Sequence, residues 1–474
     1  MHRRFAILVL SLGCAVTACG SSPAPAPVVT APFTDTLPQP DVMVNAASAP
    51  GTVEVSLVAG VNLLELAPGK PAAQAYTYNG TVPGPTLVVT EGDHVVIHFT
   101  NSLPVPTTVH WHGLHIPADQ DGSPMDPVAA GKSRDYVFDL PEGSAGTYWY
   151  HPHPEGTTAE QVAMGLFGAV VVRAKNEPLP KGLVDEVLIL NDNRFDANGA
   201  VSADTMNDQM NGRMGDVLFV NGAVSPTMTL RPGELRRLRV VNASAARYYL
   251  LSVPDHQLVK IGGSGGLFGT PQPMDQVLVA PGERAELLLQ GTAAAGTTTT
   301  LKALAYDRGL MGANGKAAPP KEADLLSIAY TSDAPMKVTA IPGTLRDIAA
   351  LDTTTAVKRT FVLSENMMTY MINGKVYDSK RVDVMAKLGA TEVWTIRNDA
   401  DMDHPFHLHG FQFQVLDRNG TPEPVVAWED TVNVPKKVSV RLAVKFTDFP
   451  GMRMYHCHIL EHEDLGMMGT LDVE

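Results

Sequence analysis

The sequence predicts an all-β fold made of three consecutive Greek-key β-sandwich domains. Short stretches such as 95–99 and 235–241 alternate apolar and polar residues and are closed by turn residues, which is typical of strands. Long runs of apolar residues at helical spacing are scarce. The third observation is an internal repeat whose period has the length of a domain, which excludes a short solenoid unit.

Each copy of this repeat begins with Asn-Gly, passes through a strand, a glycine-containing turn and a second strand, and ends on Asn. The three copies are residues 78–101, 219–242 and, with weaker similarity, 371–398. Their Asn-Gly glycines lie 142 and 152 residues apart. The domains are therefore expected near residues 52–175, 180–335 and 340–474.

Length and composition agree with this division. A chain of 474 residues is too long for a single ordinary core, and 44% hydrophobic residues indicate a globular protein. The net charge of -14 argues against a nucleic-acid partner, because phosphate groups repel an acidic surface. We expect a monomer.

The N-terminus is typical of an export signal. A short basic stretch at 2–4 precedes an apolar run at 5–16, which is too short to span a bilayer as a mature helix. The Val-Thr-Ala-Cys sequence at 16–19 then resembles a bacterial lipoprotein cleavage box. These features predict a signal peptide over residues 1–18.

Cleavage before Cys19 would leave a lipid-bearing sulfur and a flexible tether over 19–51, a segment rich in Pro, Ala, Ser and Thr. The protein is then expected to be a periplasmic or cell-envelope lipoprotein of a bacterium. Two alternatives remain open. One is an ordinary secreted protein in which Cys19 is incidental, and the other is export by the twin-arginine route, suggested by Arg3 and Arg4.

The third cysteine requires a chemical explanation. Cys14 and Cys19 belong to the export segment, and exported proteins normally use their cysteines in disulfides. Cys457 has no partner left and is flanked by histidines on both sides. A metal ligand is the reading that this environment favours.

Ten of the 15 histidines fall into four tight clusters. The clusters are His110-Trp111-His112, His151-Pro152-His153, His404 with His407 and His409, and His456-Cys457-His458 followed by His462. In a strand, residues i and i+2 point to the same face. Each His-x-His pair therefore presents two imidazoles side by side, spaced to bind one metal ion or two adjacent ions.

The last cluster indicates which metal. Imidazole suits copper, zinc, iron and nickel alike, but one Cys, two His and a weak axial Met form a type 1 copper site. Cys457, His462 and Met467 supply three of these ligands, whereas a structural zinc site would have no use for Met467. Because side chains alternate along a strand, Cys457 faces one side while its two neighbours face the other. Cys457 and its two neighbouring histidines would therefore form an electron path from the type 1 copper into a site made of histidines alone.

The motifs "HWHG", "YHPHPEG", "HPFHLHG" and "HCHILEHEDLGMM" resemble those of the multicopper oxidases, laccases and bacterial cuprous oxidases in particular. The resemblance covers nearly the whole chain after the tether. It implies cupredoxin-like domains and an oxidoreductase that takes electrons from a substrate and reduces O2 to water. The copper-binding positions of the family can be assigned to residues of this sequence through the four matching motifs.

The resemblance implies four copper ions. The type 1 ion takes His404, Cys457, His462 and Met467; the type 2 ion takes His110 and His407; the type 3 pair takes His112, His151, His153, His409, His456 and His458. Ligands come from the first and third domains, so the trinuclear site is expected at their interface. The middle domain contains one histidine, His256, and is interpreted as a spacer.

The resemblance also implies catalytic roles outside the ligand set. O2 reduction consumes four protons, so carboxylates are needed as relays. Asp121 and Glu463 match acidic residues of the family near the cluster, and the alternative for each is a solvated or capping carboxylate. His456, Cys457 and His458 would carry the electrons. His94 and His98 are expected to be ordinary strand-face residues, and His115 a rim histidine.

Methionines are the only sequence feature that bears on the substrate. The chain lacks the long Met-rich insertion of many cuprous oxidases, but carries Met206, Met210 and Met214 in a polar loop and Met367, Met368 and Met371 before the third Asn-Gly. We expect laccase-like oxidation of phenols and aromatic amines, with Cu(I) or another metal ion as the alternative substrate in copper tolerance. From a different class, a periplasmic copper-sequestering protein is disfavoured because every ligand is retained.

Overall fold

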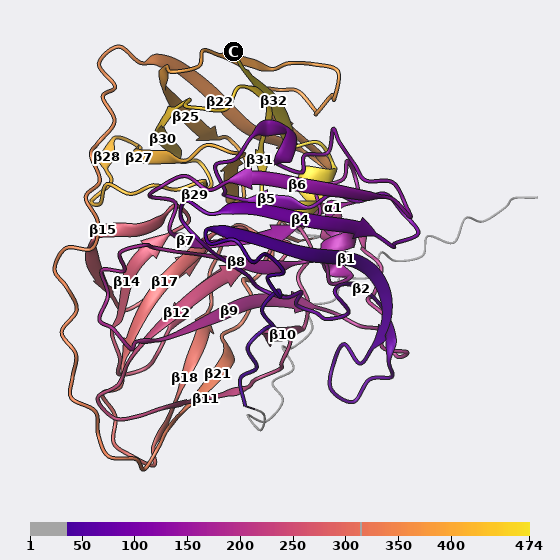
Figure 1. Ribbon diagram of the computed structural model, residues 1–474. Coiled ribbons are helices and arrows are strands. Elements are labelled where there is room, and N and C mark those ends of the chain that lie inside the picture. The colour runs from indigo at the N-terminus through magenta and orange to yellow at the C-terminus, as the bar shows by residue number, and fades with distance from the viewer. Residues whose placement is uncertain (1–35, 313–314) are drawn as a thin grey trace, which may run out of the picture.

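The computed structural model describes residues 36–312 and 315–474 (Figure 1). The predicted signal peptide, Cys19 and the first part of the predicted tether lie outside these residues. This part of the chain is nearly all β. Its short helices are α1 (Thr158–Ala163), α2 (Met206–Asn211), α3 (Leu460–Asp464) and the 3-10 turn η1 (Ala118–Gln120). None of the helices in the described ranges is long and apolar enough to span a membrane.

The first β-sandwich pairs two four-stranded sheets, in the strand orders β2-β1-β4-β6 and β3-β8-β7-β5. Its strands are β1 (Thr52–Leu64), β2 (Ala73–Tyr78), β3 (Leu87–Thr90), β4 (His94–Asn101), β5 (His110–His112), β6 (Ser133–Asp139), β7 (Gly146–His151) and β8 (Gly168–Arg173). Apolar side chains of both sheets form one buried core between them.

The second sandwich pairs a six-stranded sheet, β10-β9-β12-β17-β14-β15, with a five-stranded sheet, β11-β21-β18-β13-β16. Its strands are β9 (Val184–Asn193), β10 (Val217–Val220), β11 (Thr227–Leu230), β12 (Leu235–Asn242), β13 (Tyr249–Ser252), β14 (Leu258–Gly263), β15 (Gly266–Met274), β16 (Val277–Val279), β17 (Arg284–Gln290), β18 (Thr298–Leu304) and β21 (Ala323–Tyr330), with the small hairpin β19 (Met311–Gly312) and β20 (Gly315–Lys316).

The third sandwich repeats the six-on-five arrangement, β23-β22-β25-β30-β27-β28 over β24-β32-β31-β26-β29. Its strands are β22 (Val357–Asn366), β23 (Thr369–Ile372), β24 (Val384–Ala386), β25 (Thr391–Asn398), β26 (His404–Leu408), β27 (Phe413–Arg418), β28 (Thr421–Pro422), β29 (Thr431–Val434), β30 (Ser439–Lys445), β31 (Gly451–Cys457) and β32 (Met468–Val473). The predicted all-β, cupredoxin-like fold class is confirmed. Because each pair of sheets forms one sandwich, we propose that the three domains lie near the predicted residues 52–175, 180–335 and 340–474.

The Asn-Gly of each repeat is a turn that ties two strands together. Asn79, Asn221 and Asn373 have φ of 51°, 54° and 55°, in the left-handed region that asparagine tolerates. In each case the side-chain oxygen accepts a backbone N–H of the adjacent long strand, at 2.7 Å from Val58 to Asn79, for example. The amide nitrogen donates to a carbonyl of the same strand.

The closing asparagine of each repeat has an equally constant role. Asn101, Asn242 and Asn398 are buried, and each donates from Nδ2 to two backbone carbonyls while its Oδ1 accepts the N–H two residues ahead. Buried backbone groups in these corners are thus satisfied by side chains. The sequence repeat therefore marks structural corners of the three sandwiches.

The expectation of a flexible tether over 19–51 is wrong for its second half. Leu37 and Met43 are buried at 8% and 7% exposure. The Leu37 N–H donates to Thr227 O at 2.8 Å in the second sandwich, and the Met43 N–H donates to Thr86 O at 2.9 Å in the first. The segment from residue 36 onward is thus pinned across two sandwiches by apolar burial and backbone hydrogen bonds.

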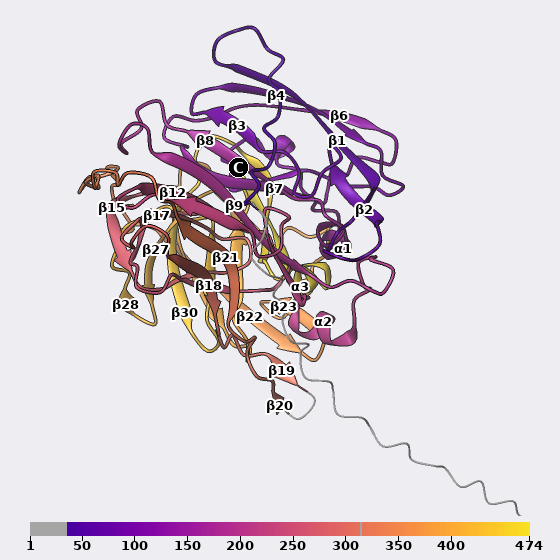
Figure 2. The ribbon, with the colours of Figure 1, turned by 90° about the horizontal axis from the view of Figure 1, so that it is seen from below.

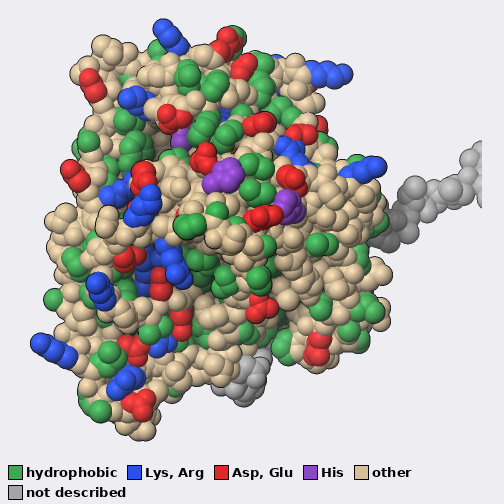
Figure 3. Space-filling view, viewed as in Figure 1, with side chains coloured by type: hydrophobic (Ala, Val, Ile, Leu, Met, Phe, Trp, Pro, Cys, Tyr) green, Lys and Arg blue, Asp and Glu red, His purple; other side chains and the backbone are tan. Residues whose placement is uncertain are grey.

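The first and third sandwiches lie against each other, and the second lies below both (Figure 1). Strand β7 of the first sandwich contacts β12 and β17 of the second, and α1 and α2 both pack against α3 of the third (Figure 2). Acidic and basic side chains are interspersed over the surface shown in Figure 3, with no large patch of one sign. The three-way junction of the sandwiches is where the histidine clusters meet.

Candidate metal centre

Two pairs of strands deliver the histidines. In the first sandwich, β5 pairs antiparallel with β7 so that His110 lies opposite His151. In the third sandwich, β26 pairs antiparallel with β31 so that His407 lies opposite His456. These two pairings come together at the junction and bring all four sequence clusters into two neighbouring sites.

The larger site, here named the eight-histidine cluster, contains His110, His112, His151, His153, His407, His409, His456 and His458, all fully buried. Ring nitrogens from different strands converge within it. The Nε2 atoms of His110 and His407 lie 3.4 Å apart, and those of His153 and His456 lie 3.2 Å apart. The Nε2 atom of His409 lies 3.0 Å from that of His456.

Hydrogen bonds orient the rings of this cluster. Backbone carbonyls lie next to the Nδ1 atoms of four rings, at 2.9 Å for Asp121 O and His110, 2.9 Å for Asp430 O and His407, 2.8 Å for Pro152 O and His151, and 3.0 Å for Cys457 O and His456. Each Nδ1–H donates to its carbonyl, so the lone pair of Nε2 points inward. A hydrogen bond at the outer nitrogen is the usual arrangement for metal-binding imidazoles.

Burial also keeps several of these rings neutral. It lowers the pKa of His407 to about 4, and it holds the pKa values of His112, His151 and His458 well below the ordinary value. Neither ring nitrogen of His458 has a hydrogen-bond partner within the described part of the chain. Neutral imidazoles with convergent lone pairs and unpartnered nitrogens fit metal cations, since buried polar atoms otherwise need partners.

The second site, here named the Cys457 site, is built from His404, Cys457 and His462. His404 Nδ1 lies 3.3 Å from Cys457 Sγ, and the rings of His404 and His462 have centroids 5.2 Å apart. Met467 is fully buried beside them: its N–H donates to His462 O at 2.9 Å, and its carbonyl accepts the Cys457 N–H at 3.0 Å. One thiol, two imidazoles and a thioether are the donor set of type 1 copper.

Three consecutive residues join the two sites. His456 and His458 lie in the eight-histidine cluster, whereas Cys457 lies in the Cys457 site. Burial raises the pKa of the Cys457 thiol, so a bound cation is needed to stabilise its thiolate. The donor chemistry and the unpartnered nitrogens together indicate that both sites fit copper.

Both carboxylates singled out from the sequence contact the eight-histidine cluster. Asp121 is fully buried, and its Oδ2 accepts a hydrogen bond from His409 Nδ1 at 2.7 Å. Glu463 is also buried and lies 3.1 Å from His456 Nδ1 and 3.4 Å from His153 Nδ1. Burial opposes ionisation of Glu463, but the two imidazoles outweigh burial and lower its pKa.

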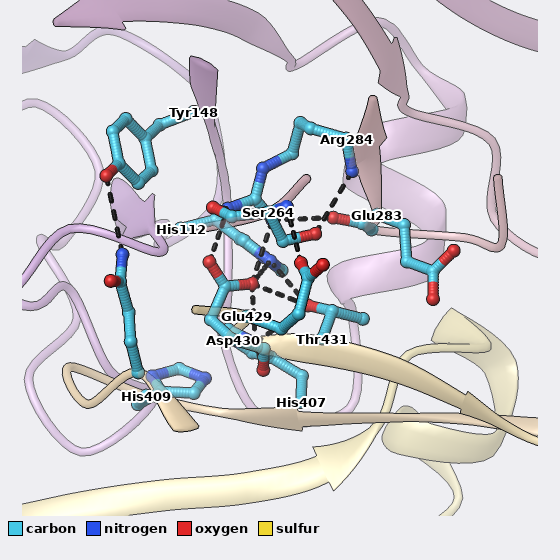
Figure 4. Close-up of polar contacts among 12 residues, drawn as sticks. His112, Tyr148, Ser264, Glu283, Arg284, His407, His409, Glu429, Asp430 and Thr431 are labelled. Carbon is cyan, nitrogen blue, oxygen red and sulfur yellow. Dashed lines mark hydrogen bonds and ion pairs between the residues drawn. The ribbon is translucent and has the colours of Figure 1, made fainter. Parts of the chain in front are cut away.

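An ion pair that the sequence analysis missed supports the opposite side of the cluster (Figure 4). Asp430 Oδ1 lies 3.2 Å from His112 Nε2, and Thr431 Oγ1 lies 3.0 Å from both His112 Nε2 and His407 Nδ1. The Asp430 carboxylate binds both Nη atoms of Arg284, with 2.8 Å between Nη1 and Oδ1. In the sequence, Asp430 is marked only as one of two acidic residues that precede a short strand.

Arg284 begins β17 of the second sandwich, so the middle domain contributes a buried charge at the cluster, while its interpretation as a spacer stays a prediction. The side chain is 1% exposed and crosses to the third sandwich to reach Asp430. A buried carboxylate beside two candidate ligands requires a counter-charge, and the second sandwich supplies it.

The other histidines that the structure describes join neither site. His94 and His98 lie half-exposed on β4 and pair across the sheet with Asp139 and Asp135, at 2.7 Å and 2.8 Å. His115 contacts Asp448 at 3.2 Å on the wall of a cavity of about 350 Å³.

The methionines flagged in the sequence lie on the elements that cover the Cys457 site. Met206 on α2 is 72% exposed, and Met367 at the turn between β22 and β23 is 84% exposed. Tyr370 joins these elements: its ring stacks on His462 with centroids 3.8 Å apart, and its hydroxyl donates to Met210 O at 2.8 Å. His404 and His462 are fully buried below this cover.

Comparison with known proteins shows the family. Three family models described as multicopper oxidase match residues 64–177, 146–297 and 350–474. Multicopper oxidase mco of Staphylococcus aureus is 33% identical over 406 residues, which cover 84% of this chain and 83% of that protein.

Two solved structures extend the likeness to the whole architecture. A multicopper oxidase from Campylobacter jejuni, described as a metallo-oxidase, has a TM-score of 0.87 and 35% identity, covering 96% of this chain and 99% of its own. A laccase from Pediococcus acidilactici has a TM-score of 0.84 and 30% identity, covering 94% and 95%. The chain therefore belongs to the multicopper oxidase family and is a copper-dependent oxidoreductase.

Proposed function

We propose that this enzyme couples the oxidation of a reducing substrate at one copper ion to the reduction of O2 to two waters at three further copper ions. We further propose that a metal ion, Cu(I) before others, is its preferred substrate. The observation that carries the first proposal is the pair of buried donor sets joined by His456, Cys457 and His458.

The proposed ligand sets follow the two sites. At the Cys457 site, His404, Cys457, His462 and Met467 would hold the type 1 ion; in the eight-histidine cluster, His110 and His407 would hold the type 2 ion and the other six histidines the type 3 pair. Copper, when bound, would supply one-electron oxidation at the first site and O2 reduction at the second.

The chain itself would supply the path and the positioning. Because Cys457 is bonded through the backbone to His456 and His458, a short covalent route joins the two sites. Asp121 fixes His409 through its Oδ2 and is proposed as a proton relay; its Oδ1 has no hydrogen-bond partner among the residues described and lies 3.7 Å from Nη1 of the buried Arg453. Glu463 holds the Nδ1 sides of His153 and His456.

The cover over the Cys457 site favours a metal ion over a phenol. An aromatic substrate would have to contact a ligand ring, yet His404 and His462 are fully buried under α2 and the β22–β23 hairpin. Exposed thioethers lie on these elements, and Glu365 Oε2 lies 3.8 Å from His404 Nε2 with its side chain 12% exposed. Soft thioethers select Cu(I), and a carboxylate near the ligand ring gives a cation a second attraction.

The similarity to a structure described as a metallo-oxidase supports this choice. Laccase-like oxidation of phenols and aromatic amines remains the second candidate, and the 30% identity to a laccase over almost the full chain supports it. The two candidates differ in what must approach the buried ligand rings, so kinetics can separate them.

The deciding experiment measures O2 uptake by the copper-loaded enzyme with Cu(I), with a phenol and with an aromatic amine. We expect kcat/KM to be highest for Cu(I). The double variant Met206→Leu/Met367→Leu should raise the KM for Cu(I) and leave the rate of phenol oxidation unchanged. Met336→Leu, an exposed methionine of the linker before the third sandwich, is the matched control. A phenol with the higher kcat/KM would select the laccase candidate, and no O2 uptake with any reductant would select copper sequestration.

A further inference from the structure

We propose that Arg308 of the second sandwich is a positioning residue that raises the reduction potential of copper at the Cys457 site through its buried positive charge. The proposal rests on the proposed occupancy of that site. It assigns to the middle domain a direct influence on electron entry, in addition to the support that Arg284 gives to the eight-histidine cluster.

Arg308 lies between the two segments that carry the histidines of the Cys457 site. It follows β18 and is 2% exposed. Its Nη1 lies 3.7 Å from the sulfur of Met402, two residues before His404. Its Nη2 donates to the carbonyl of Asn211, the last residue of α2, and α2 packs on the helix that carries His462.

Within residues 36–312 and 315–474, no carboxylate lies within ion-pair distance of the guanidinium, and its Nε has no hydrogen-bond partner. The carboxylates of Asp403 and Glu461 lie farther away but still interact with it electrostatically. Its charged face is covered by the ring of Tyr248, whose centroid lies 5.7 Å from Cζ. The nearby Asp403 carboxylate is already bound by the Tyr306 hydroxyl at 2.7 Å and the Lys436 N–H at 2.9 Å.

An unpaired buried arginine is costly, because burial removes the hydration of a charge that arginine does not give up. The cost requires a compensating negative charge, and the thiolate of copper-bound Cys457 would be one. Arg308 and Cys457 lie close enough to interact electrostatically.

A fixed cation close to a redox site favours the state that holds one more electron. Reduction of the copper adds one negative charge, and the attraction between that charge and Arg308 is weakly screened in a buried environment. Arg308 therefore stabilises the reduced form relative to the oxidised form. Removal of its charge should lower the potential without changing the ligands.

The test is a redox titration of the copper-loaded enzyme, followed through the visible absorption of the copper–Cys457 bond. Arg308→Gln keeps a donor for Asn211 O but lacks the charge, Arg308→Met lacks both, and Arg308→Lys keeps the charge. We expect the Gln and Met variants to lower the equilibrium constant for reduction of the copper about tenfold. For a one-electron couple this corresponds to a reduction potential lower by about 59 mV. The Lys variant and Arg346→Gln, a half-buried arginine distant from the site, should retain the wild-type potential.

The absorption band should keep its position and intensity in every variant, because the ligands are unchanged. An unshifted potential in both Arg308→Gln and Arg308→Met would overturn the proposal. So would an equal fall in Arg308→Lys, because shape or hydrogen bonding would then be the cause. Absence of the band from the wild-type enzyme would instead overturn the proposed copper occupancy, so the two failures are distinguishable.

Discussion

Replacing Arg284 by methionine tests whether the ion pair with Asp430 holds the second and third sandwiches together beneath the eight-histidine cluster. The substitution removes the cation that neutralises a fully buried carboxylate. It also removes donors to three backbone carbonyls, Thr147 O at 3.1 Å, Gly282 O at 2.8 Å and Ser264 O at 2.6 Å. The methionine side chain fills most of the space but satisfies none of these groups.

The expected cost follows from the uncompensated charge. Removing one partner of a buried ion pair costs about 3–5 kcal/mol of unfolding free energy. For domains of this size, that corresponds to a fall in Tm of about 6–20 °C. Arg346→Met is the control: Arg346 donates to two carbonyls but has no carboxylate partner among the residues described, so its loss should cost under about 1 kcal/mol.

The loss of unfolding free energy in Arg284→Met should also depend on pH. Burial would raise the pKa of Asp430, but Arg284 and His407 outweigh burial and hold the pKa below its ordinary value. In the wild type the ionised carboxylate therefore stabilises the fold at every pH above the unfolded value of about 3.9. Without Arg284, burial raises the folded pKa above that value, so the carboxylate destabilises the variant at high pH and takes up a proton as the pH falls.

Thermal unfolding of copper-free wild type, Arg284→Met and Arg346→Met at pH 8 and pH 5 measures both effects. We expect the difference in Tm between wild type and Arg284→Met to be larger at pH 8. A difference below about 2 °C at pH 8, or a difference that does not shrink at pH 5, would refute the role given to the ion pair.

Three further predictions concern the sites and the N-terminus. Cys457→Ser should abolish the intense visible band and substrate oxidation while the histidine-bound coppers remain, as metal analysis and EPR would show; a retained band would contradict the assignment of the Cys457 site. Asp121→Asn should slow O2 reduction by about 10²–10⁴-fold, while stopped flow should show unchanged reduction of the copper at the Cys457 site. The control Asp119→Asn, at an exposed position, should reduce O2 at the wild-type rate. An Asp121→Asn variant that also reduces O2 at the wild-type rate would remove Asp121 from the relay. Cys19→Ser should release the protein from the membrane fraction, and mass spectrometry should no longer show the added mass of a lipid. A wild-type protein found only in the soluble fraction would refute the lipoprotein expectation.

The candidate ligands could be predicted from sequence because copper chemistry requires particular residue types at short spacing. A strand places i and i+2 on one face, so motifs such as His110-Trp111-His112 state the local geometry directly. The repeat of Asn-Gly and closing Asn marked the strand corners for the same reason, since each is satisfied by contacts within one sandwich. Local rules suffice wherever the partners lie in one sandwich.

The residues that were missed depend on contacts between sandwiches. Arg284 and Asp430 are 146 positions apart, and Arg308 lies 94 positions from Met402. Arg284, Asp430 and Arg308 are each a single charged residue in an ordinary strand or loop, without a repeated pattern to mark it. Leu37 and Met43 were missed for a related reason, because two apolar residues in a stretch rich in Pro and Ala carry no periodicity.

Strand parity explains how β26 and β31 keep two metal sites separate while joining them. On β31, Cys457 has the opposite parity from His456 and His458; on β26 and its continuation, His404 has the opposite parity from His407 and His409. Side chains of one parity thus form the Cys457 site and those of the other enter the eight-histidine cluster.

The pairing of Phe406 with Cys457 aligns the two strands so that their parities match. A slip of one residue between β26 and β31 would direct Cys457 into the histidine cluster and both neighbouring imidazoles away from it. On the other side of β31, the register against β32 is fixed because Tyr455 lies over Gly469, where any side chain would collide with its ring. The register of one buried strand therefore determines both the separation of the two sites and the covalent path between them.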